Sequence, residues 1–342
     1  MGPNPILLFW PAQSIMSLPL HQGDTYMNFG FRAPSRGPLA TPDSLATLAQ
    51  KGEAMGYNIV SVSDHVVMPK VANSTYPYSK TGTFGGGTET LELLTILSYL
   101  AGVTSSIRLL TSVLVVPHRP AVLTAKVLST IDVLSKGRVV VGCGAGWLRE
   151  EFEAIDAPDF DRRGAVTSEY IRAFKELWTS DSPTFDGEFT NFSNIHFEPK
   201  PVQKPHPPIW IGGESNVALR RVARLGDCWY PIGSNPTFPV GTVEELTASI
   251  DRIKGYAEEI GRDPAEIGVA YNVTWNNDRE ATILADGKRR SFTGVPEQVA
   301  ADIKSFEAAG LEDIVLGFEK PTLEETLEGM ERFASNVIPL TK

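Results

Sequence analysis

The chain has 342 residues, of which 42% are hydrophobic and 21% charged. That composition is typical of a globular protein with a large core, and the length suits one large barrel or two ordinary domains. The formal net charge of −10 argues against a nucleic acid or an anionic membrane as partner, since neither would attract an acidic chain. Cys143 and Cys228 are too few for disulfides or zinc, so we expect buried free thiols, no metal and a cytoplasmic location.

The amino-terminal segment is expected to lie outside the core. Residues 1–26 include an apolar stretch that has no basic segment, is interrupted by Pro11 and is too short to span a bilayer. Met27 then opens a segment with the pattern of a first strand. We therefore expect residues 1–26 to be an extension and residues 27–342 to form a single domain.

A strand-then-helix rhythm runs through the rest of the chain. Strand patterns occur at residues 28–32, 58–63, 107–115, 139–143, 209–212, 227–231, 267–274 and 313–316. Helical patterns separate them; in one, Leu123, Val127, Ile131 and Leu134 recur at helical spacing before Gly137. A further excursion, TFDGEFTNF, predicts a hairpin with Asp186 and Gly187 at its turn. Eight strands alternating with helices predict an α/β fold of the (β/α)8 TIM-barrel class.

Two of these strands end in glycine-rich turns. RVVVGCGAGWLREE places Gly142, Gly144 and Gly146 after the fourth strand, and PPIWIGGES places Gly212 and Gly213 before a helix that starts at Ser215. Glycines at a strand end let the backbone approach a flat or anionic group. We therefore predict a cofactor at the carboxyl ends of the strands, with its phosphate at the Ser215 helix. A Rossmann domain is a poorer match, because GCGAG lies on the fourth strand.

Polar side chains close two other strands. Asp64 and His65 follow the second strand, where an acid beside an imidazole can bind a heterocycle or move a proton. A helix-capping aspartate with a structural histidine is the alternative. Thr111, Ser112 and Val113 interrupt the apolar third strand, and they either line the site or bond to the backbone.

Several further residues are candidates for the wall of the site. Residues 69–88 form a loop that is long for a compact domain, which indicates a binding loop or lid. Trp147, Trp229 and Tyr230 either line a substrate pocket or pack in the core. His118 and Arg119 favour a solvated surface, whereas Arg163, Glu169 and Tyr170 favour a structural network.

These segments together resemble the luciferase-like monooxygenase superfamily, and within it the branch of coenzyme F420-dependent oxidoreductases. The matching segments are MNFGFRAPSRGP, VSVSDHVVMP, STYPY, IRLLTSVLVVPHRPAVLTAKVLSTIDVLSKGRVVVGCGAGWLREEFEA, PKPVQKPHPPIWIGGES and ARLGDCWYP. They occur in family order between Met27 and Phe318. The resemblance implies a bacterial-luciferase-like TIM barrel with insertions, usually a homodimer, that binds F420 or FMN.

The resemblance implies hydride transfer between coenzyme F420 and a small organic substrate as the first expectation. The first alternative is a monooxygenase that uses FMNH2 and dioxygen, with a partner reductase that supplies reduced cofactor. The second alternative is a non-catalytic flavin-binding protein, against which the intact pair of Asp64 and His65 argues.

The resemblance also implies roles for particular residues. Asp64 and His65 match the catalytic pair beside the ring, and the segment from Thr111 to Val113 matches the wall behind it, with a cis bond between Ser112 and Val113. Gly212 and Gly213 match the glycines near the phosphate, and Gly144, Gly146 and Ser215 complete the expected cofactor contacts. Sugar-phosphate dehydrogenases of this superfamily carry a glutamate where Trp147 stands, so oxidation of a sugar phosphate is not expected.

Overall fold

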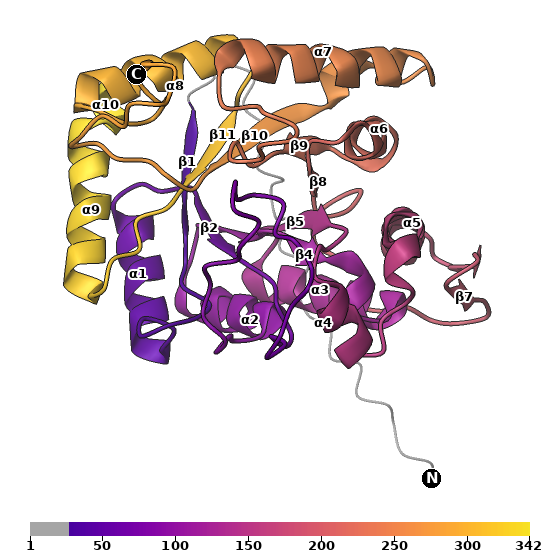
Figure 1. Ribbon diagram of the computed structural model, residues 1–342. Helices are drawn as coiled ribbons and strands as arrows, with labels where there is room; N and C mark the ends of the chain where they lie inside the picture. Colours follow the sequence, from indigo (N-terminus) through magenta and orange to yellow (C-terminus); the bar gives the residue numbers. More distant parts are fainter. Residues whose placement is uncertain (1–26) are drawn as a thin grey trace.

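The computed structural model describes residues 27–342, in which parallel strands close into an eight-stranded barrel (Figure 1). The barrel strands are β1 (Asn28–Arg32), β2 (Ile59–Val62), β3 (Arg108–Thr111) with its continuation β4 (Leu114–Val115), β5 (Val139–Gly144), β8 (Ile209–Gly212), β9 (Cys228–Tyr230), β10 (Gly268–Val273) and β11 (Asp313–Leu316). Pairing of β1 with both β2 and β11, and of β5 with both β3 and β8, completes the ring. The predicted TIM barrel is confirmed.

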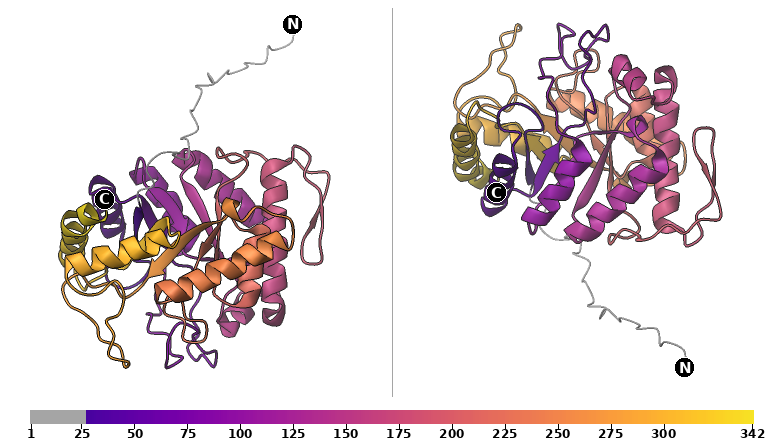
Figure 2. Two further views of the ribbon diagram at one scale, coloured as in Figure 1. Left: turned by 90° about the horizontal axis from the view of Figure 1, so that it is seen from above. Right: turned by 90° about the horizontal axis from the view of Figure 1, so that it is seen from below.

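Helices surround the barrel on its outside, as Figure 1 and the two turned views of Figure 2 show. The long helices are α1 (Pro42–Ala54), α2 (Leu93–Val103), α3 (Ala121–Ser135), α5 (Arg163–Thr179), α6 (Asn216–Leu225), α7 (Val243–Glu258), α8 (Pro296–Ala308) and α9 (Leu323–Asn336). Shorter turns are α4 (Arg149–Ala154), α10 (Ile338–Thr341) and the 3-10 segments η1 (Val116–His118), η2 (Phe160–Arg162) and η3 (Pro264–Glu266). Helix α2 begins at Leu93 because Glu92 caps it, accepting from the Thr95 amide.

The excursion between β5 and β8 contains the predicted hairpin. Strands β6 (Phe185–Asp186) and β7 (Asn191–Phe192) pair antiparallel, and the Gly187 amide donates to the Thr190 carbonyl at the turn. The Glu169 carboxylate accepts from the backbone amides of Glu188, Phe189 and Thr190, so it holds this turn against α5. The predicted structural role of Glu169 agrees with these contacts.

Helix α3 is present, but its buried face differs from the apolar pattern. Leu123 and Leu134 are 57% and 61% exposed, and of that set only Ile131 is fully buried. The helix turns smaller side chains inward, and the carbonyl of buried Ala125 accepts a hydrogen bond from the Trp178 indole of α5. Because α3 lies close to α5, the face of α3 that carries smaller side chains is the one that is buried, and Leu123 and Leu134 remain on the surface.

The barrel interior is filled by every second residue of its strands, because successive side chains point to opposite faces. The inner cluster comprises Ile59, Leu110, Val140, Trp210, Cys228, Tyr230, Ala270 and Val315. At Gly30 an added Cβ would lie 2.8 Å from the Ile59 Cβ, so glycine leaves the room that this packing needs. Cys143 and Cys228 are buried and free, as predicted.

The third barrel strand breaks where the sequence turns polar. Strand β3 ends at Thr111, β4 resumes at Leu114, and the bond between Ser112 and Val113 is cis, which confirms the expectation. The glycines of β5 lie directly beneath this break. A Cβ on Gly142 would overlap the Thr111 carbonyl oxygen, and one on Gly144 would lie 2.5 Å from Val113 Cγ2.

Two further observations concern the limits of the domain. Residues 1–26, predicted to be an extension, lie outside the described residues, so the boundary at Met27 stays a prediction. Within residues 27–342, none of the helices combines the length and apolar character that crossing a membrane requires.

The contact between Gly142 and Thr111 gives a test of the barrel packing. Gly142→Ala should destabilise the protein by about 1–3 kcal/mol, because the added methyl must displace backbone in a packed interior. Urea unfolding followed by circular dichroism measures this difference. Gly102→Ala, in α2 with no atom within 4 Å of the added Cβ, is the matched control and should be neutral or stabilising. Equal stability of both variants would contradict the described packing.

Candidate active site

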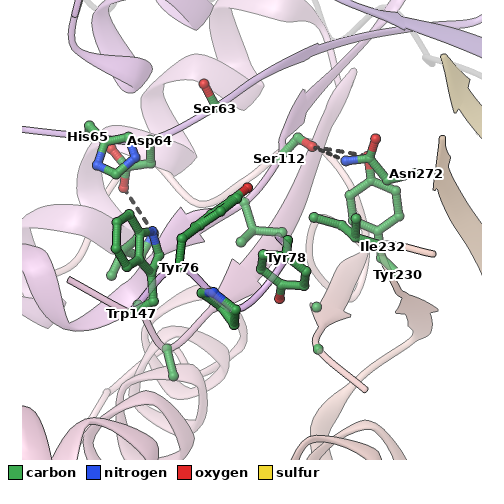
Figure 3. Close-up of a pocket in the computed structure, with 18 of the residues that line it drawn as sticks. Ser63, Asp64, His65, Tyr76, Tyr78, Ser112, Trp147, Tyr230, Ile232 and Asn272 are labelled. Atoms are coloured by element: carbon green, nitrogen blue, oxygen red, sulfur yellow. Dashed lines mark hydrogen bonds between the residues drawn. The ribbon is translucent and has the colours of Figure 1, made fainter. Parts of the chain in front are cut away.

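A cavity of about 290 Å³ opens where the barrel strands end (Figure 3). Its wall comes from the carboxyl ends of seven barrel strands, with the segments that follow them, and from the loop of residues 69–88. The predicted residues that line it are Asp64, His65, Ser112, Val113, Gly144, Gly146, Trp147, Gly212, Gly213, Ser215 and Tyr230. The structure thus brings together residues that lie up to 166 positions apart in the chain, since Asp64 and Tyr230 both line this cavity.

The structure places two of the predicted residues elsewhere. Trp229 is fully buried between barrel and helices, where its indole donates to the Gly213 carbonyl. Tyr230, one position on, points inward instead, because neighbours on a strand face opposite sides. Thr111 is buried as well, and its hydroxyl donates to the Gly142 carbonyl rather than facing the cavity.

His65 is held by a buried glutamate that the sequence did not identify. The Nδ1 atom of His65 lies 2.9 Å from Oε2 of Glu151, which is 1% exposed. Glu151 also accepts from the amides of Val66 and Val67, at 2.6 and 3.2 Å. Burial raises the pKa of Glu151, but these bonds and the nearby histidines lower it below its usual value. The ionised carboxylate fixes the proton on Nδ1 and leaves Nε2 as an acceptor.

Asp64 faces the cavity, but its carboxylate already has strong partners. Arg119 donates to both oxygens at 2.8 Å, and the Val115 amide donates at 2.9 Å. The Arg119 guanidinium also reaches Glu92 at 2.7 Å. Arg119 was expected at a solvated surface; it is half-buried instead, because the carboxylates on both sides compensate its desolvation.

His118 was also expected at the surface, and it is buried in the cavity wall instead. Its ring packs edge-on against Phe152 with centroids 4.7 Å apart. Both ring nitrogens are buried without a hydrogen-bond partner among the described residues. Burial lowers the pKa of His118, so the imidazole is neutral at pH 7 and offers one donor and one acceptor.

A second polar group lies on the opposite side of the cavity, across from His65 and Trp147 (Figure 3). The Ser112 hydroxyl is 3.0 Å from the Tyr230 hydroxyl and accepts from Asn272 Nδ2 at 3.4 Å. The Oδ1 atom of Asn272 is buried without a partner in the described part of the chain. Unpaired buried donors and acceptors are costly, so the wall fits a flat heterocycle with polar edges.

One end of the cavity has the features of an anion site. Gly213 has φ +102°, and Ser215 caps α6 by accepting from the Ala218 amide at 3.3 Å. The buried Arg221 is fixed by the Ser168 hydroxyl and the Gly164 carbonyl, both at 2.9 Å, and it also lines the cavity. A helix start beside a guanidinium matches a phosphate in charge and in hydrogen bonding.

The loop of residues 69–88 covers the cavity, as a binding loop would. Tyr76 packs against Phe84 and Trp147, with ring centroids 5.1 and 5.0 Å apart. The loop is anchored to Glu150, which accepts from the Asn73 amide at 2.6 Å and from the Ser74 hydroxyl at 2.7 Å. The aromatic cluster therefore forms a roof over His65.

Glu214, between the glycines and Ser215, is a buried carboxylate that secures the next loop. It accepts from the Ile232 amide and the Asn235 amide group, each at 2.8 Å. Burial raises its pKa to about 7, although these hydrogen bonds act in the opposite direction. The carboxyl group is therefore the acidic group beside the cavity that titrates near neutral pH.

Glu151, Arg221 and Asn272 were not identified from the sequence as residues of the site. Glu151 lies 86 positions from its partner His65. Nothing in the local spacing links the two residues. Among residues 27–342, no group of three or more His, Cys, Asp or Glu side chains is arranged to hold a metal ion.

Comparison with known proteins adds the family. Residues 25–283 match the family model described as luciferase-like monooxygenase. An FMNH2-dependent dimethylsulfone monooxygenase of Pseudomonas putida is 33% identical over 251 residues, which cover 72% of this chain and 66% of that protein, just under two thirds of its length. An uncharacterized protein of Mycobacterium tuberculosis is 32% identical over 302 residues, covering 85% of this chain and 93% of that protein.

Solved structures share the architecture. An F420-dependent secondary alcohol dehydrogenase, in complex with an F420-acetone adduct, aligns with a TM-score of 0.73 and 19% identity over 93% of this chain and 99% of that chain. A monooxygenase from Streptomyces bottropensis aligns with a TM-score of 0.70 and 21% identity over 92% and 99%. At these identities the likeness establishes the fold.

Glu214 should make stability depend on pH. Its pKa is raised on folding from 4.5 to about 7, so its protonated form stabilises the fold below pH 4.5 and that contribution is lost as pH rises through 7. Between pH 5 and pH 8 the wild type should therefore lose up to about 3 kcal/mol of unfolding free energy relative to Glu214→Gln. Urea titrations across pH measure it. The exposed Glu297→Gln is the control, and parallel profiles for Glu214→Gln and wild type would disprove the assignment.

Proposed function

The chain belongs to the luciferase-like monooxygenase family, and on that premise we propose that it oxidises a small organic substrate with reduced FMN and dioxygen. It is an enzyme of the class that contains F420-dependent oxidoreductases and flavin-dependent monooxygenases. In the proposed reaction a separate flavin reductase delivers reduced FMN. The observation that carries the proposal is the cavity, which combines an anion-binding end, a polar wall and His65 across from that wall.

The choice of FMN departs from the first expectation, which was coenzyme F420. Two relatives with a named activity, from Pseudomonas putida and Pseudomonas fluorescens, are both described as FMNH2-dependent, at 33% and 29% identity. The F420-dependent protein described above is 19% identical, which speaks for the fold and not for the cofactor. FMN is therefore proposed as the cofactor, and F420 is its competitor in the test below.

Different residues of this chain would bind different parts of the cofactor. Gly213, Ser215 and Arg221 would hold the phosphate, and the orphaned polar atoms of His118 and Asn272 would satisfy the polar edges of the ring. Reduced FMN, when bound, would supply two electrons for the reduction of dioxygen, of which one oxygen atom enters the substrate and the other leaves as water. The segment Ser112–Val113 and the bare Gly144 leave a flat wall on which a ring can lie.

His65 is the residue proposed to accept a proton during the oxidation of the substrate. Its Nε2 atom is left as an acceptor, because Glu151 holds the proton on Nδ1. A neutral imidazole can take a proton at Nε2, and the buried carboxylate behind it stabilises the resulting charge. The aromatic roof of Tyr76, Phe84 and Trp147 would exclude water from this exchange. Asp64 is proposed to shape the ring site from its fixed position beside Arg119.

Anaerobic titration tests the cofactor directly. The protein should bind reduced FMN at least tenfold more tightly than reduced F420, measured by quenching of its fluorescence. Exposure of the reduced FMN complex to air, with dimethylsulfone as the first probe substrate, should then consume oxygen and release oxidised FMN. His65→Gln should lower product formation about 100-fold or more while leaving FMN affinity unchanged.

Each outcome of that titration has a separate meaning. Preference for F420, or no flavin binding, would overturn the proposed cofactor. Binding of reduced FMN with no turnover on any of a series of small organic probes would support a non-catalytic flavin-binding protein. Full activity of His65→Gln across pH would show that His65 is structural.

A homodimer is also proposed, supported by the apolar residues left on α2 and α3. Tyr99, Leu123 and Leu134 are 38%, 57% and 61% exposed on these adjacent helices. Burial of such side chains in a dimer would remove this surface from water. Light scattering after gel filtration should give twice the monomer mass, and Leu123→Lys with Leu134→Lys should give a monomer. Val217→Lys on α6, where the side chain is 67% exposed, is the control.

A further inference from the structure

Two arginines in and beside the cavity have no carboxylate to neutralise them. Arg36 lines the cavity itself, whereas Arg32 lines a separate pocket formed with residues that follow β10 and β11, and its charge acts on Tyr76 and Tyr230 of the cavity wall. Among the residues that the structure describes, carboxylates pair with Arg108, Arg119, Arg149, Arg162, Arg220, Arg262, Arg289 and Arg332. Arg32 and Arg36 have no such partner in that part of the chain. Arg138, Arg163 and the cavity-lining Arg221 also lack a carboxylate, but each of them donates to a backbone carbonyl instead. The Nε atom of Arg32 is buried without any acceptor among the described residues.

Both guanidinium groups are held in place rather than free to leave. Arg32 ends β1, and its guanidinium occupies the space that a side chain at Gly317 would fill. Arg36 lines the cavity, donates to the Ser63 hydroxyl at 3.2 Å and stacks over Phe84 at 5.0 Å. Its backbone is fixed by a β-bridge to Thr90. The local structure therefore fixes Arg36 in the cavity wall and Arg32 close enough for its charge to act on Arg36.

Holding two cations there is unfavourable in the absence of an anion. Burial lowers the pKa of both Arg32 and Arg36, and the charge on Arg32 lowers the pKa of Arg36 further. The exposed carboxylate of Glu319 acts on both but forms no ion pair with either. A chain with a net charge of −10 has many carboxylates, yet none is placed against these groups in the described residues. Such a site gains most from a ligand that brings its own negative charge.

We propose that Arg32 and Arg36 form a subsite for an oxyanion. The substrate would then carry an anionic group in which oxygen atoms are bonded to sulfur or carbon, such as a sulfonate, a sulfinate or a carboxylate. The inference rests on the proposed function, since it assigns the substrate class of the same cavity. Guanidinium forks match such planar or tetrahedral oxyanions with paired hydrogen bonds. The hydroxyl of Tyr76, which feels the charge of both arginines, is a third donor nearby.

The cofactor phosphate is the other anion that could occupy these arginines, and the layout of the cavity argues against it. The phosphate end is built by Gly213, Ser215 and Arg221, after β8. Arg32 and Arg36 follow β1, which is separated from β8 in the barrel by β11, β10 and β9. The two anion sites thus lie on well-separated barrel strands, as a cofactor phosphate and a substrate headgroup require.

The test uses small probes on the complex with FMN, where the phosphate site is filled. Methanesulfonate and acetate are titrated calorimetrically, with dimethylsulfone and acetamide as neutral counterparts of similar shape. The anions should bind at least tenfold more tightly than the neutral probes. Arg36→Gln and Arg32→Lys should each weaken anion binding about tenfold and leave the neutral probes unchanged. Arg172→Gln, an exposed arginine of α5 without an ion pair, controls for the loss of net charge.

A second arm compares FMN with riboflavin as ligands of the same variants. Unchanged affinity for both flavins, with lost anion binding, supports the substrate subsite. A selective loss of FMN affinity would assign the arginines to the cofactor phosphate and overturn the inference. Equal binding of anions by wild type and Arg36→Gln, in protein that still binds FMN, would also overturn it. Failure to bind any flavin would instead refute the proposed function, so the two outcomes are distinct.

Discussion

The barrel mouth depends on one buried ion pair, between Asp64 and Arg119. Asp64 follows the second strand, and its carboxylate is fully buried. This carboxylate accepts hydrogen bonds from two nitrogen atoms of the Arg119 guanidinium and from the amide of Val115 on β4. Arg119 continues to Glu92, which caps α2. One network thus ties two barrel strands to an outer helix. Loss of Arg119 would leave the Asp64 carboxylate buried without its counterion, which costs roughly 3–5 kcal/mol.

Regular patterns allowed most of the fold to be predicted from the sequence. The alternation of strands and helices predicted the barrel, and Gly144 and Gly212 marked the strand ends that face the site. Asp64 and His65 were found because strand ends of a barrel converge on one face. These predictions share one property: each rests on residues within a few positions of one another.

The remaining features depend on contacts that local patterns do not record. The face of α3 was decided by close approach to Trp178, more than 40 positions later. Trp229 and Tyr230 are neighbours in the sequence and were equally good candidates for the cavity wall. Only the register of β9 in the barrel determines that Tyr230 points inward. Glu151 became visible only when the fold brought it to His65. Tertiary distance, rather than weak local signal, limits such predictions.

The polar groups in and beside the cavity differ in how many hydrogen bonds they form, and those without a partner indicate which groups a ligand would have to supply. The carboxylates of Asp64 and Glu151 each accept from at least three donors. The cation Arg32 retains an unused buried donor, and neutral His118 retains both a donor and an acceptor. A partner that only donated hydrogen bonds would leave the arginine unmatched. An occupant that brings negative charge and a heterocycle together would satisfy both groups, which is what the proposed flavin phosphate and oxyanionic substrate have in common with the needs of this barrel mouth.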